Sequence, residues 1–177
     1  MVGFECLYGL KHWKRKDGSM AIKLDMSKAY NRVEWCFIEQ MMAKLGFSDN
    51  WINKIIGCVK SISYSLIING EVVSNLKPTS GLRQGDPISP YMFLMCTEGL
   101  LCLLNKANLD QSISGYKSSR FGLVITHLFF TDDSLLFSRA TVSYCEGIGK
   151  VLKDYALASD QVVNYAKSIM CLSPSVG

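Results

Sequence analysis

Residues 129–137 read Phe-Phe-Thr-Asp-Asp-Ser-Leu-Leu-Phe, so that Asp132 and Asp133 lie side by side between two apolar runs. Such runs are typical of buried strands, and the polar pair between them predicts a tight hairpin turn within residues 122–138. Aspartate is an ordinary turn residue, so a plain β-turn is one interpretation. The other is a pair of charges beside a core, which repel each other unless a cation neutralises them. Hard carboxylate oxygens of this kind suit magnesium.

The overall composition indicates one folded domain with a sizeable core. The 177 residues are 49% hydrophobic and 19% charged, and the net charge is +4. This mild positive charge is compatible with a polyanionic partner but does not require one. The seven cysteines include no Cys-x-x-Cys pair. They indicate reduced thiols, mostly in the core, of an intracellular protein, nuclear or cytoplasmic, without zinc.

Membrane association is not expected. No signal peptide is visible at the N-terminus, where Glu5 is followed by a basic stretch. The most apolar run, residues 91–104, contains Glu98 and is too short to span a bilayer. Nothing in the sequence indicates an oligomer.

Another carboxylate stands at the end of a predicted strand. Residues 21–25 read Ala-Ile-Lys-Leu-Asp and predict a short strand that ends at Asp25. Strand ends are where open α/β sheets place their ligand contacts. Residues 26–33 turn into a helix that stops at Gly46, and Ser48 begins a second helix.

The sequence predicts a hairpin at residues 64–76, because Asn69-Gly70 favours a type I′ turn between two apolar runs. Further along, Ile148, Val151, Leu152 and Tyr155 mark a helix, and residues 169–172 predict a last strand. Near the N-terminus, the basic residues 11–18 are either a solvated loop or a phosphate-contacting or targeting segment.

A glycine-containing loop at residues 79–87 leads into a long apolar helix. The loop is either an ordinary helix entry or a ligand-binding loop in which Gly85 lets the backbone approach a ligand, with Arg83 and Gln84 as polar contacts. Ser89 is expected to cap the helix, which runs to about Asn105. It is apolar nearly all round, so we expect it to be buried against a sheet.

Three carboxylates, Asp25, Asp132 and Asp133, could meet if their strands are neighbours in one sheet. Clustered carboxylates are the chemistry of a two-metal site, in which two ions stabilise the attacking and leaving oxygens of an in-line displacement. Phosphoryl transfer needs mainly positioning and charge neutralisation, so few protein groups suffice.

Four segments in order resemble successive motifs of reverse transcriptases, in the branch of plant LINE-type, non-LTR retrotransposons. They are residues 23–30 (KLDMSKAY), 81–90 (GLRQGDPISP), 127–133 (HLFFTDD) and 161–168 (QVVNYAKS). Order and spacing agree over about residues 20–173. The resemblance implies an α+β polymerase palm, a small antiparallel sheet with helices packed on one face. Residues 20–177 would be this palm with a partial fingers insertion at about residues 64–76. Residues 1–19 would be a remnant of the fingers and a basic loop.

The resemblance also implies an RNA-directed DNA polymerase that joins dNTPs to a DNA primer on an RNA template. Asp25, Asp132 and Asp133 would hold two Mg²⁺ ions. Lys167 would protonate the pyrophosphate leaving group or stabilise its charge. Tyr30 would be the aromatic gate that excludes a ribose 2′-OH. Gln84 and Gly85 would contact the incoming nucleotide and the template, and Arg83 would also bind substrate.

The chain departs from the family at Asn31 and Thr131, where aspartate and alanine are usual; neither change touches the three carboxylates. By comparison with the family, we expect this chain to lack most of the fingers, the thumb and any endonuclease or zinc-knuckle region, so the isolated chain is expected to be inactive. The alternative function is a truncated, non-catalytic retrotransposon relic that at most binds nucleic acid. A small α/β domain with an accidental acidic turn is disfavoured by four motifs in order.

Overall fold

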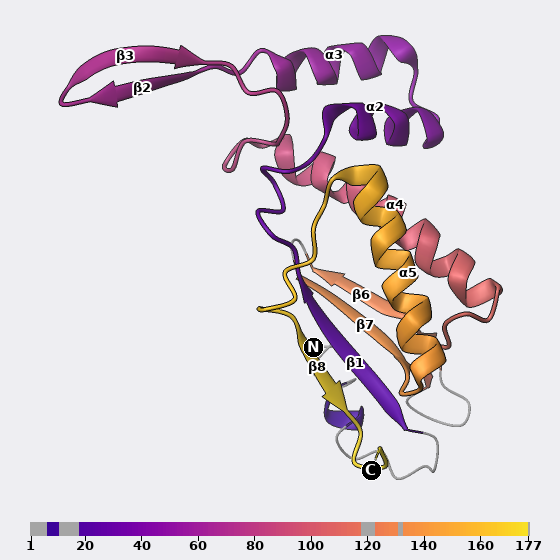
Figure 1. The fold of residues 1–177 in the computed structure, drawn as a ribbon. Helices are drawn as coiled ribbons and strands as arrows, with labels where there is room; N and C mark the ends of the chain where they lie inside the picture. The colour runs from indigo at the N-terminus through magenta and orange to yellow at the C-terminus, as the bar shows by residue number, and fades with distance from the viewer. Residues whose placement is uncertain (1–6, 11–17, 118–122, 131–132, 177) are drawn as a thin grey trace. The chain divides into compact units, whose positions relative to one another are not determined.

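The computed structural model describes residues 7–10, 18–117, 123–130 and 133–176 (Figure 1). Its elements follow the chain in this order: β1 (Ser19–Asp25), α2 (Trp35–Lys44), α3 (Asp49–Lys60), β2 (Tyr64–Ile68), β3 (Glu71–Leu76), α4 (Ser89–Leu109), β4 (Tyr116–Lys117), β5 (Val124–Ile125), β6 (His127–Phe130), β7 (Asp133–Arg139), α5 (Val142–Ser159) and β8 (Ile169–Leu172). The chain divides into two compact units: the first is formed by residues 1–29 and 99–177, and the second by residues 30–98.

The first unit is built on an antiparallel sheet with the strand order β6-β7-β1-β8. The predicted first and last strands are confirmed as β1 and β8. Strand β1 is central because it pairs with β7 along one edge and with β8 along the other. The predicted acidic hairpin is confirmed as β6 and β7, which pair from Phe130↔Asp133 onward.

This hairpin differs from the prediction in two details. Asp133 is the first residue of β7 and not a turn residue, which leaves residues 131 and 132 as the connection, outside the described part of the chain. Strand β5, which the sequence placed in the hairpin, pairs with β4 in a separate two-stranded sheet.

The two faces of the main sheet are covered by different parts of the chain. Because neighbouring residues of a strand face opposite sides, Met20 and Ala21 mark the two faces. The Cys145 thiol of α5 lies 3.5 Å from the Met20 sulfur, which places α5 on one face (Figure 1). Ala21 packs on the other face in a buried cluster with Leu10, Tyr116 and Phe137. Both faces of the sheet are therefore shielded from water next to β1.

Helix α5 confirms its prediction in detail. The four apolar residues that predicted it are all buried: Ile148, Val151, Leu152 and Tyr155. The Thr141 side chain accepts a hydrogen bond from the Tyr144 N–H and so caps the first turn. Asp160 ends the helix in the left-handed conformation, with φ of 57°.

The second unit contains α2, α3 and the β2–β3 hairpin. Both helices agree with the sequence prediction, and α3 buries one stripe formed by Ile52, Ile56 and Val59. The hairpin has the predicted turn: φ is 52° at Asn69 and 87° at Gly70, as a type I′ turn requires. All residues of its two strands are exposed.

Helix α4 is buried along one stripe only, although its sequence is apolar nearly all round. It begins at Ser89, the predicted cap, and it continues past Asn105, the predicted end, to Leu109. Only one stripe is buried, and it includes Met92, Cys96, Leu100 and Leu104. Apolar residues on the other side are exposed, for example Tyr91 and Leu94. Apolar composition alone does not tell which side of a helix meets a neighbour.

No helix within the described ranges is both long enough and apolar enough to cross a bilayer.

Candidate active site

Asp25 lies at the end of the central strand, and its backbone is held from one side by the chain around residues 161–168. The Asp25 N–H donates to the Ser168 Oγ over 3.1 Å, and the Asp25 carbonyl accepts from the Asn164 N–H over 2.8 Å. Asp25 is partly buried. The backbone at a strand end is ordinarily mobile. These two hydrogen bonds hold the Asp25 backbone, and they therefore restrict where its carboxylate can lie.

On the opposite side, β7 brings the acidic hairpin to the same end of the sheet. Asp25 pairs in register with Asp133, the first residue of β7. Asp132 lies outside the described residues, so its predicted position beside Asp25 stays a prediction. The register therefore joins two of the three predicted carboxylate positions from segments far apart in sequence.

Lys167 belongs to a tight turn at the end of the same 161–168 segment. The N–H groups of Lys167 and Ser168 both donate to the Asn164 carbonyl, over 3.1 and 2.9 Å. The Lys167 residue is exposed. Its turn neighbour Ser168 contacts Asp25, so the predicted general acid and the predicted metal ligand are carried by directly bonded segments.

Tyr30 lies in the 30–98 unit, where two contacts fix it. Its ring stacks on Phe93 of α4, with centroids 4.8 Å apart and an angle of 14° between the planes. Its carbonyl accepts from the Leu82 N–H over 2.7 Å. The predicted gate residue is therefore tied to the start of α4 and to the loop that precedes it.

Arg83, Gln84 and Gly85 lie on that loop, and all three are exposed. Gly85 has φ of +86°, a conformation that favours glycine. The Asp86 carboxylate accepts from the Ile88 N–H over 3.0 Å and closes the loop just before α4. The three predicted substrate residues are thus presented to solvent on a loop with a fixed end.

The base of this loop is tied to the chain after Tyr30 by contacts that only glycine permits. Gly81 has φ of +88°, its N–H donates to the Val33 carbonyl over 2.8 Å, and its carbonyl accepts from the Trp35 indole N–H over 2.8 Å. A Cβ at Gly81 would lie 2.7 Å from the Asn31 carbonyl oxygen. The approach of these two backbones therefore sets the position of the loop.

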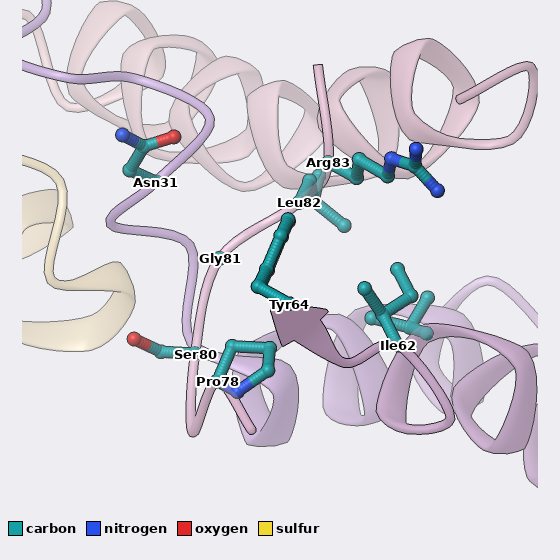
Figure 2. A pocket seen from close by; sticks show the side chains of 9 residues that line it. Asn31, Ile62, Tyr64, Pro78, Ser80, Gly81, Leu82 and Arg83 are labelled. Carbon is teal, nitrogen blue, oxygen red and sulfur yellow. The ribbon is translucent and has the colours of Figure 1, made fainter. Parts of the chain in front are cut away.

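A cleft of about 260 Å³ opens beside this contact (Figure 2). Figure 2 shows Tyr64 extending from the start of β2 toward Leu82, with Arg83 and Asn31 on opposite sides of Gly81. Ile62 and Pro78 contribute apolar walls. Its lining contains one cationic side chain and no carboxylate, so an anionic or neutral group fits it better than a cation.

Sequence reasoning missed the residues that hold the predicted site in place: Gln161, Ser168, Gly81, Trp35 and Phe93. Each acts through a partner distant in sequence, such as the 143 positions that separate Ser168 from Asp25. The glycine pattern of residues 81–85 was the one available signal, because a glycine before a functional loop often marks a close backbone approach. Within the described residues no three His, Cys, Asp or Glu side chains form a ready metal cluster.

Comparison with known proteins connects this geometry to one family. The family model "Reverse transcriptase (RNA-dependent DNA polymerase)" matches residues 2–176. The chain is 44% identical over 68 residues to an uncharacterized mitochondrial protein of Arabidopsis thaliana, covering 38% of this chain and 56% of that protein. It is 26% identical over 169 residues to the transposon TX1 149 kDa protein of Xenopus laevis, covering 94% of this chain and 12% of that protein.

A third relative is the Pol polyprotein of the type-1 retrotransposable element R2 of Popillia japonica, 26% identical over 115 residues, which cover 65% of this chain and 18% of that protein. The chain thus spans between 12% and 56% of the length of these three relatives.

Solved structures show the fold. Telomerase from Candida tropicalis, in complex with a fragment of telomeric RNA, superimposes with a TM-score of 0.70 at 13% identity, over 97% of this chain and 29% of that one. Apo telomerase from the same organism gives 0.67 at 16% identity, over 98% and 35%. The α+β, palm-like fold expected from the motifs is therefore confirmed. With the family model matching nearly every residue, the chain belongs to the reverse transcriptase family.

Proposed function

We propose that this chain is the polymerase palm of a plant LINE-type, non-LTR retrotransposon protein, and that it adds dNTPs to a primer 3′-OH on an RNA template. The family match and the retrotransposon relatives support this reading, and the Arabidopsis relative supports the plant origin. In this proposal residues 20–177 form the palm, the hairpin at about residues 64–76 is its fingers insertion, and residues 1–19 belong to the fingers region and a basic loop.

The observation that carries the proposal is the pairing of Asp25 with Asp133 at one end of the sheet. It brings a strand-terminal carboxylate to the acidic hairpin that the sequence singled out. Aspartate oxygens are the hard donors that Mg²⁺ prefers, and Asp25 is partly exposed, so the donor set fits this ion. We assign Asp25, Asp132 and Asp133 as the residues that would hold two Mg²⁺ ions.

When bound, the two ions would neutralise charge on the attacking and leaving oxygens of the phosphoryl transfer. The chain's own residues then have to position the reactants. Lys167 supplies a proton or a positive charge to the pyrophosphate that leaves. Its exposed position on the Asn164 turn, bonded to the Asp25 strand end, is compatible with both tasks.

Substrate selection is assigned to the 30–98 unit. The Tyr30 ring, which stacks on Phe93, would exclude a ribose 2′-OH by its bulk, and the Tyr30 carbonyl, which accepts from the Leu82 N–H, would hold it in place. Arg83, Gln84 and Gly85 would contact the nucleotide and the template from their exposed loop. RNA as the template class is supported by the family and by the telomerase–RNA complex, whose fold this chain shares.

The metal assignment can be tested on the 177-residue chain without any polymerase activity. Mn²⁺ binding can be measured by titration followed by electron paramagnetic resonance. Asp25→Asn and Asp132→Asn should each lower the Mn²⁺ affinity by roughly tenfold or more, because each removes one charged ligand. Asp154→Asn, which removes an exposed carboxylate of α5, serves as the control and should leave the binding unchanged. Equal Mn²⁺ affinities of the wild type and Asp25→Asn would contradict the proposal.

A further inference from the structure

Residues 161–168 run alongside residues 25–29, the end of β1 and the chain that follows it, and several hydrogen bonds join the two segments. Residues 25–29 and 161–168 are joined by one isolated antiparallel bridge, Met26↔Val163. Four hydrogen bonds join the same two segments: Asp25 N–H to Ser168 Oγ (3.1 Å), Asn164 N–H to the Asp25 carbonyl (2.8 Å), Ser27 N–H to the Val162 carbonyl (2.8 Å) and Gln161 Nε2–H to the Ala29 carbonyl (2.9 Å).

The Ser168 hydroxyl occupies a position where the regular sheet has ended. The β1–β8 ladder stops at the pair Lys23↔Ile169, so Asp25 lies beyond it. Ser168 replaces the missing strand partner with its side chain. Its hydroxyl also donates to the Asn164 carbonyl over 2.9 Å, which leaves an oxygen lone pair for the Asp25 N–H. The orientation of this hydroxyl is therefore fixed by one hydrogen bond that it donates and one that it accepts.

These bonds also determine how Asp25 meets Asp133. In an antiparallel ladder, a residue directs its N–H and its carbonyl toward the same neighbouring strand. Both groups of Asp25 are engaged by residues 164 and 168, so its pair with Asp133 is of the type without hydrogen bonds. Such pairs have the shorter Cα–Cα separation, about 4.5 Å instead of about 5.5 Å. The two acidic positions are thereby held at the closest spacing that the ladder allows.

The other end of the contact is buried. Gln161 is 1% exposed, and while its Nε2 bonds Ala29, its Oε1 has no hydrogen-bond partner among the described residues. A buried polar atom without a partner opposes folding. Gln161 thus holds the Ala29 backbone in one position, while its unpaired oxygen lowers its net contribution to the free energy of unfolding.

We infer that Ser168 is a positioning residue for the metal site: residues 161–168 fix the Asp25 carboxylate opposite Asp133 and connect it to the turn that carries Lys167. This inference rests on the proposed function, in which Asp25 binds a metal ion. Removing the Ser168 hydroxyl should leave all the carboxylate groups present but make the Asp25 backbone more mobile, so that the Asp25 carboxylate is less well positioned. Loss of a group that orients a metal ligand typically weakens metal binding by about 10–100-fold.

The chain offers a matched control at the other end of the same strand. The Ser19 N–H donates to the Ser173 Oγ over 3.0 Å, so Ser168 and Ser173 flank β8 and make the same kind of bond to the two ends of β1. Ser168→Ala and Ser173→Ala therefore remove equivalent bonds, one beside Asp25 and one remote from it. A role in stability alone predicts similar effects of the two substitutions.

The test is Mn²⁺ titration of the 177-residue chain by electron paramagnetic resonance, together with amide hydrogen exchange by NMR. Ser168→Ala is expected to weaken Mn²⁺ binding on the order of tenfold and to speed exchange of the Asp25 amide. Ser173→Ala should speed exchange of the Ser19 amide and leave Mn²⁺ affinity at the wild-type value. Ser168→Thr, which keeps a hydroxyl, should restore the affinity.

The outcomes separate this inference from the proposed function. If wild-type Mn²⁺ binding depends on Asp25 but Ser168→Ala and Ser173→Ala lower it equally, or not at all, the positioning role is wrong and the metal site stands. If Asp25→Asn binds Mn²⁺ as well as the wild type, the metal role of Asp25 fails and the inference fails with it. An unchanged hydrogen-exchange rate of the Asp25 amide in Ser168→Ala also overturns the inference, because the hydroxyl would then not hold that backbone.

Discussion

Replacing Gly81 by alanine should destabilise the 30–98 unit through backbone contacts that no rotamer can relieve. The added Cβ would lie 2.7 Å from the Asn31 carbonyl oxygen and 3.1 Å from the Asn31 carbonyl carbon and Cα. Gly81 also has φ of +88°, which an L-residue adopts only with strain. The chain must therefore move at Gly81, at Asn31 or at both.

The magnitude follows from three contributions. A left-handed conformation costs a non-glycine residue about 1–2 kcal/mol. Moving the loop weakens the bonds of Gly81 to Val33 and Trp35, each 2.8 Å long and worth about 1 kcal/mol. Alanine also restricts the unfolded chain, which offsets roughly 0.4–1 kcal/mol. The net loss in the free energy of unfolding is about 2–3 kcal/mol, which lowers Tm by roughly 4–12 °C for a chain of this size.

Two glycines of the same unit serve as controls in thermal and urea unfolding followed by circular dichroism. Gly85 has φ of +86° but open space around its Cβ position, so Gly85→Ala should show the strain alone, a net loss of about 1 kcal/mol or less. Gly57 lies inside α3 with open space, so Gly57→Ala should stabilise by about 1 kcal/mol. If Gly81→Ala is no less stable than Gly85→Ala, the backbone contact with Asn31 does not hold the loop.

Further predictions concern the gate, the buried thiol, a helix cap and the isolated chain. In a longer chain that extends primers, Tyr30→Ala should increase ribonucleotide incorporation, because the ring no longer fills the space of a 2′-OH; unchanged nucleotide selection would exclude the gate role. Burial raises the pKa of the Cys96 thiol to about 12, so this thiol should stay protonated and resist iodoacetamide from neutral pH to about pH 10 while the exposed Cys36 reacts. Mass spectrometry of labelled peptides measures both, and equal labelling of the two in the native protein would contradict the burial. Thr141→Ala removes the cap bond to the Tyr144 N–H and should cost about 1 kcal/mol in urea unfolding, whereas Thr141→Ser should not. The 177-residue chain alone, with net charge +4, should extend oligo(dT) on poly(rA) negligibly with dTTP and Mg²⁺, since it offers few phosphate contacts; robust extension that Asp132→Asn abolishes would show a self-sufficient polymerase.

Elements whose causes are local could be predicted from the sequence. Asn69-Gly70 selects its turn because both positions need positive φ, and the observed values of 52° and 87° agree. The periodicity of Ile148, Val151 and Tyr155 predicted α5 because an amphipathic stripe follows from the helical repeat. The four ordered motifs identified the family, and the match over residues 2–176 confirms it.

Features that depend on partners distant in the chain could not be predicted and required the folded structure. The apolar sequence of α4 could not show that only one stripe, including Cys96 and Leu100, is buried, because this depends on which side meets its neighbours. Likewise, nothing near Asp25 indicates that Ser168 holds its backbone, since 143 positions separate the two residues. The pairing of Asp25 with Asp133 needs β7 beside β1 in the correct register, and a shift of one residue would turn the acidic position to the other face. Local propensity specifies strands and turns, whereas register and packing between distant segments place the carboxylate positions.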